Sequence, residues 1–430
     1  MPYIRAMASP RKFGVWKATA LVVGNIIGAG IFMLPRDLAP AGWTAVAAWG
    51  LAVAGALSLA WVFAQLYAHL PEAGGVHGLM TLGVGPNAAF VGSWGYLVSV
   101  WAANATLAIS GVEYLARLVP MPASVPWLRP AAALLALGLL VLANLRGRGG
   151  EVQVVSTLVK LLPLAAVIVV AAALLATRGP AVVTDAAPPP FALPMLLPAM
   201  SLTLYAMLGI ESAVVPGDLV ADAARVVPRA TMLGTALSGL VGILATCAVT
   251  LMLAGAAASE APLADFVAGA THPIAGDFVA LCAVVSCFGC LNGYLVVGTE
   301  LTADMATQGV LPARLGARNG AGVAPLPLWL GAAITTVLIL SAYTAASAFR
   351  FAALVTTATN IVLYLLCLAA TVRFLRDGRL PRAAALVGAT LGGALFSAFA
   401  LYGAGGTALA WGAALVAGGW PLYRLARRAA

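Results

Sequence analysis

A run of twelve residues near the amino terminus constrains the fold of this chain more than any other feature. Residues 24–35 read Gly-Asn-Ile-Ile-Gly-Ala-Gly-Ile-Phe-Met-Leu-Pro, which places small, helix-weakening residues inside an apolar stretch long enough to span a bilayer. A helix interrupted at that depth exposes backbone N–H and C=O groups, so it persists only where protein or a polar ligand satisfies them. Broken helices of this kind are typical of binding sites in secondary transporters.

The composition agrees with a membrane location. Hydrophobic residues make up 62% of the 430 residues and charged residues 9%, and the mean hydropathy is +1.01, far above that of a domain with a solvated surface. Apolar windows of about 20 residues, the length that crosses the hydrocarbon core, occur twelve times. They fall at roughly 14–36, 42–67, 90–118, 127–146, 152–177, 193–217, 229–256, 275–300, 325–346, 350–372, 384–403 and 405–423. The intervening loops are too short for a further domain, so residues 1–430 are expected to form a single membrane domain.

The distribution of Lys and Arg predicts the orientation, because basic residues of short loops are retained on the cytoplasmic side. With the amino terminus inside, residues 1–13 and 424–430 are cytoplasmic, and few arginines fall on the outer side. Those few are Arg36, Arg117, Arg129, Arg178 and Arg350. The net charge of +9 therefore reflects topology, and it does not indicate a nucleic-acid partner.

No cluster of side chains indicates an enzyme or a metal site. Cys287 and Cys290 have the spacing of metal ligands, but no second pair and no nearby histidine accompany them. A membrane-embedded enzyme needs a nucleophile, a base or metal ligands gathered at one depth, and the three histidines are dispersed. We therefore expect no enzymatic activity, no metal and no cofactor. A channel is disfavoured as well, because polarity is concentrated at two places rather than along a pore.

The second of these places lies in the sixth window. Residues 202–213 read Leu-Thr-Leu-Tyr-Ala-Met-Leu-Gly-Ile-Glu-Ser-Ala, with Gly209 and Glu211 near the middle. An ionised carboxylate at that depth is costly, so Glu211 is expected to face a cavity and find a partner, or to carry a proton. The alternative, which is compatible with the first, is that backbone groups at the break satisfy Glu211 and that it holds the unwound segment in place.

The first and sixth windows lie five windows apart. A five-helix unit repeated in opposite orientation makes two such windows symmetry mates at the bilayer midplane, as in inverted-repeat transporters. The sequence thus predicts an all-α membrane protein with 12 transmembrane helices. Residues 14–372 form a 5+5 inverted-repeat core with broken helices 1 and 6, and residues 384–423 add two accessory helices. The outer surface of these two helices faces either lipid or a second copy in a homodimer.

Five short motifs together resemble those of the amino acid-polyamine-organocation transporters. They are Gly28-Ala29-Gly30, Gly209-Ile210-Glu211-Ser212, the loop 71–75 (Pro-Glu-Ala-Gly-Gly), the pair Gly85-Pro86, and Asp304 with Gly309-Val310-Leu311-Pro312. Over its whole length the chain is similar to bacterial arginine/agmatine-type antiporters and to sodium-independent amino acid permeases. The resemblance implies a LeuT-like fold in the plasma membrane (the bacterial inner membrane), a small amino acid or amine as substrate, and alternating access.

The resemblance also implies roles for residues at the two breaks. The amides of Gly28, Ala29 and Gly30 would hold a substrate carboxylate at the positive end of a half-helix, although close helix packing is the alternative use of such small residues. Carbonyls near Ile26 and from Ala206 to Leu208 would receive the substrate ammonium. Ala29 stands where the arginine/agmatine antiporter has a serine, so one side-chain hydrogen bond is missing.

Aromatic and polar residues complete the predicted pocket. Tyr205 and Tyr294 stand where that antiporter has tryptophans; a tyrosine ring offers a cation a weaker π face, and it equally suits an aliphatic or thioether side chain. The polar candidates are Asn25, Asn104 and Thr359, with Thr356 beside them. For Asn25, and for Asn292 in the eighth window, a hydrogen bond between helices is the alternative.

Lys160 lies inside the fifth window, where a lysine requires an explanation. In sodium-independent members of the family, a lysine at the matching place puts its ammonium where related transporters hold sodium, bridging spans one and eight. By that resemblance Lys160 substitutes for sodium. The alternative is that its long side chain snorkels to the nearer interface.

Charged residues near the window ends are expected to form ion pairs. Glu113 and Arg117 are four residues apart on a helix and predict a pair of their own. Glu300 and Asp304 are expected either to form a cytoplasmic gate or to lie at a solvated helix end. Their partners in such a gate would be Arg225, Arg229 or Arg314.

The predicted function is sodium-independent secondary active transport of amino acids or related amines. It leans to cationic amino acid or polyamine exchange, or to proton-coupled transport, with Glu211 as the proton-sensitive switch. A permease or exporter for neutral amino acids, methionine or branched-chain, is the alternative, and a substrate-sensing membrane receptor is the alternative of another class.

Overall fold

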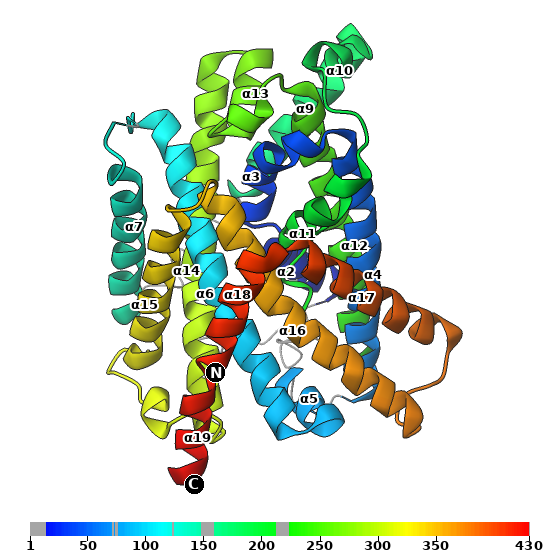
Figure 1. The fold of residues 1–430 in the computed structure, drawn as a ribbon, viewed down its shortest axis with the longest axis vertical. Coiled ribbons are helices and arrows are strands. Elements are labelled where there is room, and N and C mark those ends of the chain that lie inside the picture. Colours follow the sequence, from blue (N-terminus) through cyan, green and yellow to red (C-terminus); the bar gives the residue numbers. More distant parts are fainter. Residues whose placement is uncertain are drawn as a thin grey trace.

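The computed structural model describes residues 14–70, 73, 76–122, 124–147, 159–211 and 223–429. The regular elements in these residues are all helices (Figure 1). Nine of the described helices are long and apolar enough to cross a membrane: α4 (Trp43–His69), α6 (Pro86–Leu118), α7 (Leu128–Leu145), α9 (Leu161–Arg178), α12 (Ala223–Met252), α14 (Pro273–Thr307), α15 (Pro325–Ala342), α16 (Ala348–Arg376) and α17 (Ala384–Gly403). The expectation of an all-helical membrane protein is therefore confirmed, whereas the count of twelve spans and the inverted repeat stay predictions.

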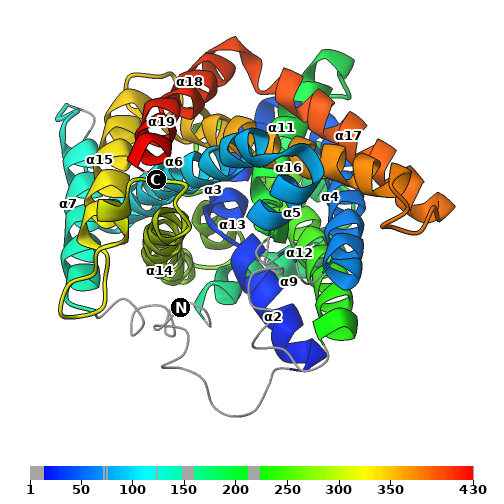
Figure 2. The ribbon, with the colours of Figure 1, turned by 90° about the horizontal axis from the view of Figure 1, so that it is seen from below.

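Helix α6 forms the centre of the molecule. It packs against α14 on one side and α16 on the other, and α12 packs against α4 on the far side of the assembly (Figure 2). Of its most apolar stretch, 94% is buried inside the protein. In Figure 1, α4 and α14 follow the long axis of the molecule, while α16 and α17 run obliquely across it.

The first helix is interrupted where the glycine motif predicts it. Helix α2 (Val15–Ile26) ends and α3 (Ala29–Leu38) begins, with Ile27 and Gly28 between them in extended conformation. This backbone leaves the last carbonyls of α2 and the first amides of α3 without helical partners. The predicted break is thus confirmed at residues 27–28.

The sixth helix is interrupted as well. Helix α11 (Leu196–Ala206) ends in a turn in which the N–H of Met207 donates to the carbonyl of Leu204 at 2.8 Å. Gly209 follows with φ 106°, a left-handed conformation that glycine adopts without strain. The helical part of the window therefore stops where the sequence places its glycine. Ser212 and the remainder of the window lie outside the described residues.

The twelfth window, expected as one span over 405–423, is divided. Helix α18 (Gly405–Ala417) stops, and α19 (Trp420–Ala429) starts after two glycines. A Cβ on Gly419 would lie 2.4 Å from the ring of Trp94, whose Nε1 donates to the carbonyl of Leu415 at 3.0 Å. The twelfth window is therefore helical on both sides of a turn that packs against α6, and its role as a span stays a prediction.

The short elements lie at the two ends of the molecule. Helices α5 (Val76–Val84) and α19 lie at one end, and α10 (Ala181–Ala186) and α13 (Pro262–Ala270) lie at the other (Figure 1). The remaining short elements are the 3-10 turns η1 (Ala39–Ala41), η3 (Leu193–Met195), η6 (Ala256–Ala258) and η7 (Ala313–Gly316).

Candidate functional site

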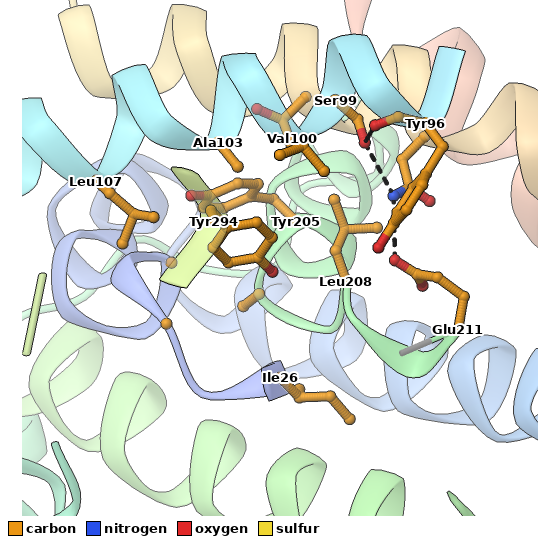
Figure 3. A pocket seen from close by; sticks show the side chains of 15 residues that line it. Ile26, Tyr96, Ser99, Val100, Ala103, Leu107, Tyr205, Leu208, Glu211 and Tyr294 are labelled. Atoms are coloured by element: carbon orange, nitrogen blue, oxygen red, sulfur yellow. Dashed lines mark hydrogen bonds between the residues drawn. The ribbon is translucent and has the colours of Figure 1, made fainter. Parts of the chain in front are cut away.

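The two helix breaks line one cavity, and α6 forms its opposite wall (Figure 3). Its lining comprises Ile26, Gly28, Gly30, Tyr96, Ser99, Val100, Ala103, Leu107, Tyr205, Ala206, Leu208, Glu211, Tyr294, Thr356 and Asn360. The free volume is about 30 Å³, which holds about two water molecules. The cavity in this structure is therefore small.

Glu211 lies at the edge of this cavity with only 3% of its surface exposed. Its Oε2 accepts a hydrogen bond from the hydroxyl of Tyr364 at 2.7 Å, and Oε1 lies 3.5 Å from Nδ2 of Asn360. That amide also donates to Ser99 Oγ at 3.3 Å, so the carboxylate is joined through α16 to α6 (Figure 3). The donors are neutral, and none of the lining residues is basic.

Gly30 allows the two broken helices to touch. A Cβ at this position would lie 2.9 Å from the Cα of Ala206 and 3.0 Å from the ring of Tyr205. Tyr205 is in turn fixed by an edge-on contact with Phe349, at 5.9 Å between ring centroids. The alternative use of this motif, close helix packing, is therefore confirmed at Gly30, while binding through its amide stays a prediction.

The start of α3 is not capped by a side chain of the described residues. A Cβ on Gly28, the residue before this helix, would meet nothing within 4 Å. Uncapped amides at a helix start are donors for an anionic group. The side chains of Asn25 and Ala29 lie outside the described residues, so the predictions made for them are not addressed.

Lys160 is buried at the start of α9, with 3% of its surface exposed. Its Nζ donates to the carbonyl of Gly24 in α2 and lies 3.8 Å from Sγ of Cys290 in α14. The side chain points inward between these helices rather than toward a surface. Its ammonium therefore lies between the first and eighth windows, and its role as a substitute for sodium stays a prediction.

Two predicted polar residues do not reach the cavity. Asn104 is fully buried on α6, but it is not among the lining residues, and neither polar atom of its amide has a hydrogen-bond partner among the described residues. Thr359 donates to the carbonyl of Val355 at 2.9 Å, and its methyl would lie 3.2 Å from a Cβ on Gly412 of α18. Helix α16 turns Thr356 and the residue one turn later to the cavity, so Thr359 faces α18.

The site also contains residues that the sequence reasoning missed. Tyr96 and Ser99 line the cavity from α6, Asn360 lines it from α16, and Tyr364 holds Glu211. Helical spacing carries the signal for the last two, because Asn360 and Tyr364 follow Thr356 by four and eight residues and share its face.

The predicted pair of Glu113 and Arg117 does not form. Glu113 pairs with Arg129 of α7 at 2.8 Å, while Arg117 binds Asp265 of α13 and Asp277 of α14, the latter at 3.2 Å. The i,i+4 expectation is wrong because neighbouring helices bring closer partners to this end of α6.

Two other polar contacts join helices outside the cavity. Asn144 Nδ2 donates to Asn292 Oδ1 at 2.7 Å, so the interhelical alternative for Asn292 is confirmed. Glu300 pairs with Arg318 at 2.7 Å, and this carboxylate raises the pKa of the Arg318 guanidinium. Sequence reasoning did not name Arg318 as the partner.

Fold and cavity together define a helical membrane protein with a polar site between two interrupted helices, the architecture of a transporter. A family model described as "Amino acid permease" matches residues 13–417. The chain therefore belongs to the amino acid permease family, within the amino acid-polyamine-organocation superfamily.

Its relatives are transporters rather than enzymes. The putrescine transporter PotE of Escherichia coli (strain K12) is 28% identical over 98% of this chain and 97% of the relative. PotE of Haemophilus influenzae is also 28% identical, over 97% of both chains. The cadaverine/lysine antiporter of Escherichia coli (strain K12) is 29% identical over 78% of this chain and 76% of the relative. The family and these relatives make the chain a multi-pass membrane transporter of amino acids or amines.

Proposed function

We propose that this chain exchanges cationic amines, either polyamines or cationic amino acids, by alternating access that needs no sodium. The observation that carries the proposal is the carboxylate of Glu211. It lies in a cavity lined by no basic residue among those described, and its hydrogen-bond partners among the described residues are neutral. A buried carboxylate in this setting favours a cation or a proton as its companion. The similarity to transporters of putrescine, cadaverine and lysine supports a cationic substrate.

The other lining groups suit the remainder of such a substrate. Tyr205 and Tyr294 present two aromatic rings to the cavity, and an ammonium is attracted to such ring faces. Carbonyls near Ile26 and from Ala206 to Leu208 receive an ammonium, and the amides at Gly28–Gly30 receive a carboxylate when the substrate is an amino acid. A diamine has no carboxylate, so its binding depends on Glu211, the carbonyls and the rings.

Lys160 supplies the fixed cation of the proposed mechanism. Its ammonium lies between α2 and α14, where the family resemblance puts a substitute for sodium. An ammonium at this place removes the need for a bound cation, and Glu211 remains free to exchange its proton for a cationic substrate. Both amine exchange and proton-coupled transport would use this replacement of a proton on Glu211 by a cationic substrate.

The charges at the two ends of the molecule support an orientation in the membrane. We infer twelve spans in a 5+5 inverted repeat over residues 14–372, accessory helices in residues 384–423, and both termini in the cytoplasm of a bacterial cell. Helix α19, with Arg424 and Arg427, lies at the same end as α5 and opposite α13 (Figure 1). Basic residues at that end support its cytoplasmic location.

Transport of neutral amino acids is the second candidate, and one observation favours it. Much of the lining is aliphatic, with Ile26, Val100, Leu107 and Leu208 around the free space. Methionine or a branched-chain side chain would pack against these residues without a charge.

Counterflow in sodium-free proteoliposomes separates the two candidates. Vesicles are loaded with putrescine, lysine, arginine, leucine or methionine, and uptake of labelled putrescine and labelled leucine is followed in parallel. We expect labelled putrescine to accumulate in vesicles loaded with cationic compounds, at a rate that added sodium leaves unchanged. Uptake of leucine alone, driven by leucine or methionine, would overturn the cationic proposal and establish the neutral one.

A further inference from the structure

Tyr114 joins two helices that belong to different parts of the structure. It lies on α6 and is fully buried. Its hydroxyl donates a hydrogen bond to the carbonyl of Phe32 at 2.8 Å and accepts one from the N–H of Leu263 at 3.2 Å. Phe32 lies in α3, the second half of the broken helix, and Leu263 lies in the first turn of α13. The Tyr114 oxygen therefore connects α3, which begins at the candidate site, to α13 at the end of the molecule.

The Tyr114 hydroxyl suits both of its hydrogen-bond partners, since it can donate one hydrogen bond and accept another. The first-turn N–H groups of a helix have no intrahelical acceptor, so the Tyr114 oxygen completes the start of α13. A hydroxyl has one proton to donate, and here that proton goes to α3. The rings of Phe32 and Tyr114 also meet edge-on at 6.2 Å between centroids. Loss of the hydroxyl would remove both hydrogen bonds and leave this ring contact in place.

Helices α6, α13 and α14 are tightly connected at the end of the molecule that carries α13; this part is called the outer block. Arg117, one turn beyond Tyr114 on α6, binds Asp265 of α13 and Asp277 of α14. A Cβ on Gly276 would lie 2.6 Å from the carbonyl oxygen of Ala264, so α13 rests directly on α14. Ion pairs and close backbone packing hold this block together, whereas Tyr114 ties α3 to it by a neutral hydrogen bond.

Tyr114 lies between the cavity and the end of the molecule that carries α13. Leu107 lines the cavity from α6, and Tyr114 follows it by two turns toward the end that carries α13 (Figure 1). If the cavity opens on this side by movement of α3, that helix separates from α6, α13 and α14. The hydrogen bond between Tyr114 and Phe32 would then break.

We propose that the Tyr114 hydroxyl is a latch that positions α3 against the α6–α13–α14 block and holds the outer side of the transporter closed. The proposal rests on alternating access in the proposed function. A neutral hydrogen bond contributes little, so the latch biases the equilibrium without preventing opening. Its loss is expected to raise the outward-open population by about two- to tenfold, the range that such bonds contribute.

External labelling of a cysteine in the cavity tests this latch. Leu107 is 2% exposed, so Leu107→Cys becomes reactive to a membrane-impermeant thiol reagent only when the outer side opens. Tyr114→Phe is made in this background, and Tyr343→Phe is the matched control, because the Tyr343 hydroxyl is buried without a partner among the described residues. Background labelling of the five buried native cysteines is subtracted with the Leu107 protein.

We expect the labelling rate to rise about two- to tenfold in Tyr114→Phe and to stay unchanged in Tyr343→Phe. Equal rates in the parent and in Tyr114→Phe would overturn the proposal, as would an equal rise in both variants. A role confined to completing α13 would lower the melting temperature without a change in labelling, so melting curves are recorded beside the rates. Labelling needs no substrate, and the test therefore stands even if the cationic substrate class is wrong.

Discussion

Lys160 donates a hydrogen bond from its ammonium to the carbonyl of Gly24. In a continuous helix that carbonyl would accept from the N–H of residue 28, but the chain is extended at Gly28 and this partner is lost. The ammonium replaces it and places a positive charge at the end of α2, where the helix dipole is negative. The break and the buried lysine therefore stabilise each other.

Replacement of Lys160 by glutamine should disable transport. The amide lacks the charge that meets the α2 carbonyls, and a hydrogen bond to a charged group contributes about 1.5–3 kcal/mol, so we expect sodium-free uptake to fall by about tenfold or more. Initial rates in proteoliposomes measure this loss. Arg178→Gln is the control, since Arg178 forms an exposed pair with Asp185 and should transport normally. Full activity of Lys160→Gln would contradict the assigned role.

Glu211→Gln should abolish exchange of cationic substrates and the dependence of transport on pH. Glutamine keeps an acceptor for the Tyr364 hydroxyl, which lies 2.7 Å from Oε2, but it has no charge and no proton to exchange. We expect putrescine counterflow to fall by about a hundredfold, as for a buried charge left without its partner. Rates measured from pH 5.5 to 8 test both effects. Glu260→Gln serves as control, because Glu260 is a half-exposed carboxylate paired with Arg129 at the end of the molecule that carries α13. A pH-dependent, active Glu211→Gln protein would refute the prediction.

The interruptions were predictable because glycine and an intramembrane acid stand out in an apolar window. The positions of Gly28 and Gly209 locate the breaks at α3 and α11, and Lys160 stands out in the same way. Single anomalous residues therefore predict the most unusual backbone of the chain.

The side chains of the cavity were harder to predict. Thr356 and Thr359 are equivalent in the sequence, and only the rotation of α16 against α6 and α18 decides that Thr356 lines the cavity. The same rotation brings Tyr364 to Glu211. Ion pairs such as that of Arg117 with Asp265 depend on how α13 packs on α6, which spacing within one helix does not contain.

Gly30→Ala should destabilise the transporter. The new methyl would lie 2.9 Å from the Cα of Ala206, and because the obstacle is backbone, α3 and α11 must move apart. Overpacking of this kind costs about 1–3 kcal/mol, so we expect a lower melting temperature in detergent and slower transport. Gly50→Ala on α4 is the matched control, since its methyl would meet nothing within 4 Å, and its melting temperature should be equal or slightly higher. Equal melting temperatures of the Gly30→Ala and Gly50→Ala variants would show that α3 and α11 can move apart at little cost in stability.

His77 should make the protein less stable in acid. Its Nδ1 lies 2.7 Å from Ser93 Oγ between α5 and α6, and burial lowers the pKa of the imidazole below its ordinary value of 6.5. The folded protein thus binds this proton more weakly than the unfolded chain does. Stability is therefore unaffected above the ordinary pKa and falls as the pH drops through it toward the lower folded value.

Melting temperatures at pH 7.5 and 5.5 measure this effect of His77. We expect a smaller decrease between the two pH values in His77→Gln than in the parent, because glutamine cannot be protonated in the unfolded chain. His69→Gln is the control, since the His69 ring lies at the surface beside the Gln65 carbonyl, and its decrease should match that of the parent. If the melting temperature of His77→Gln fell as much between pH 7.5 and 5.5 as that of the parent, another group would have to account for the loss of stability in acid.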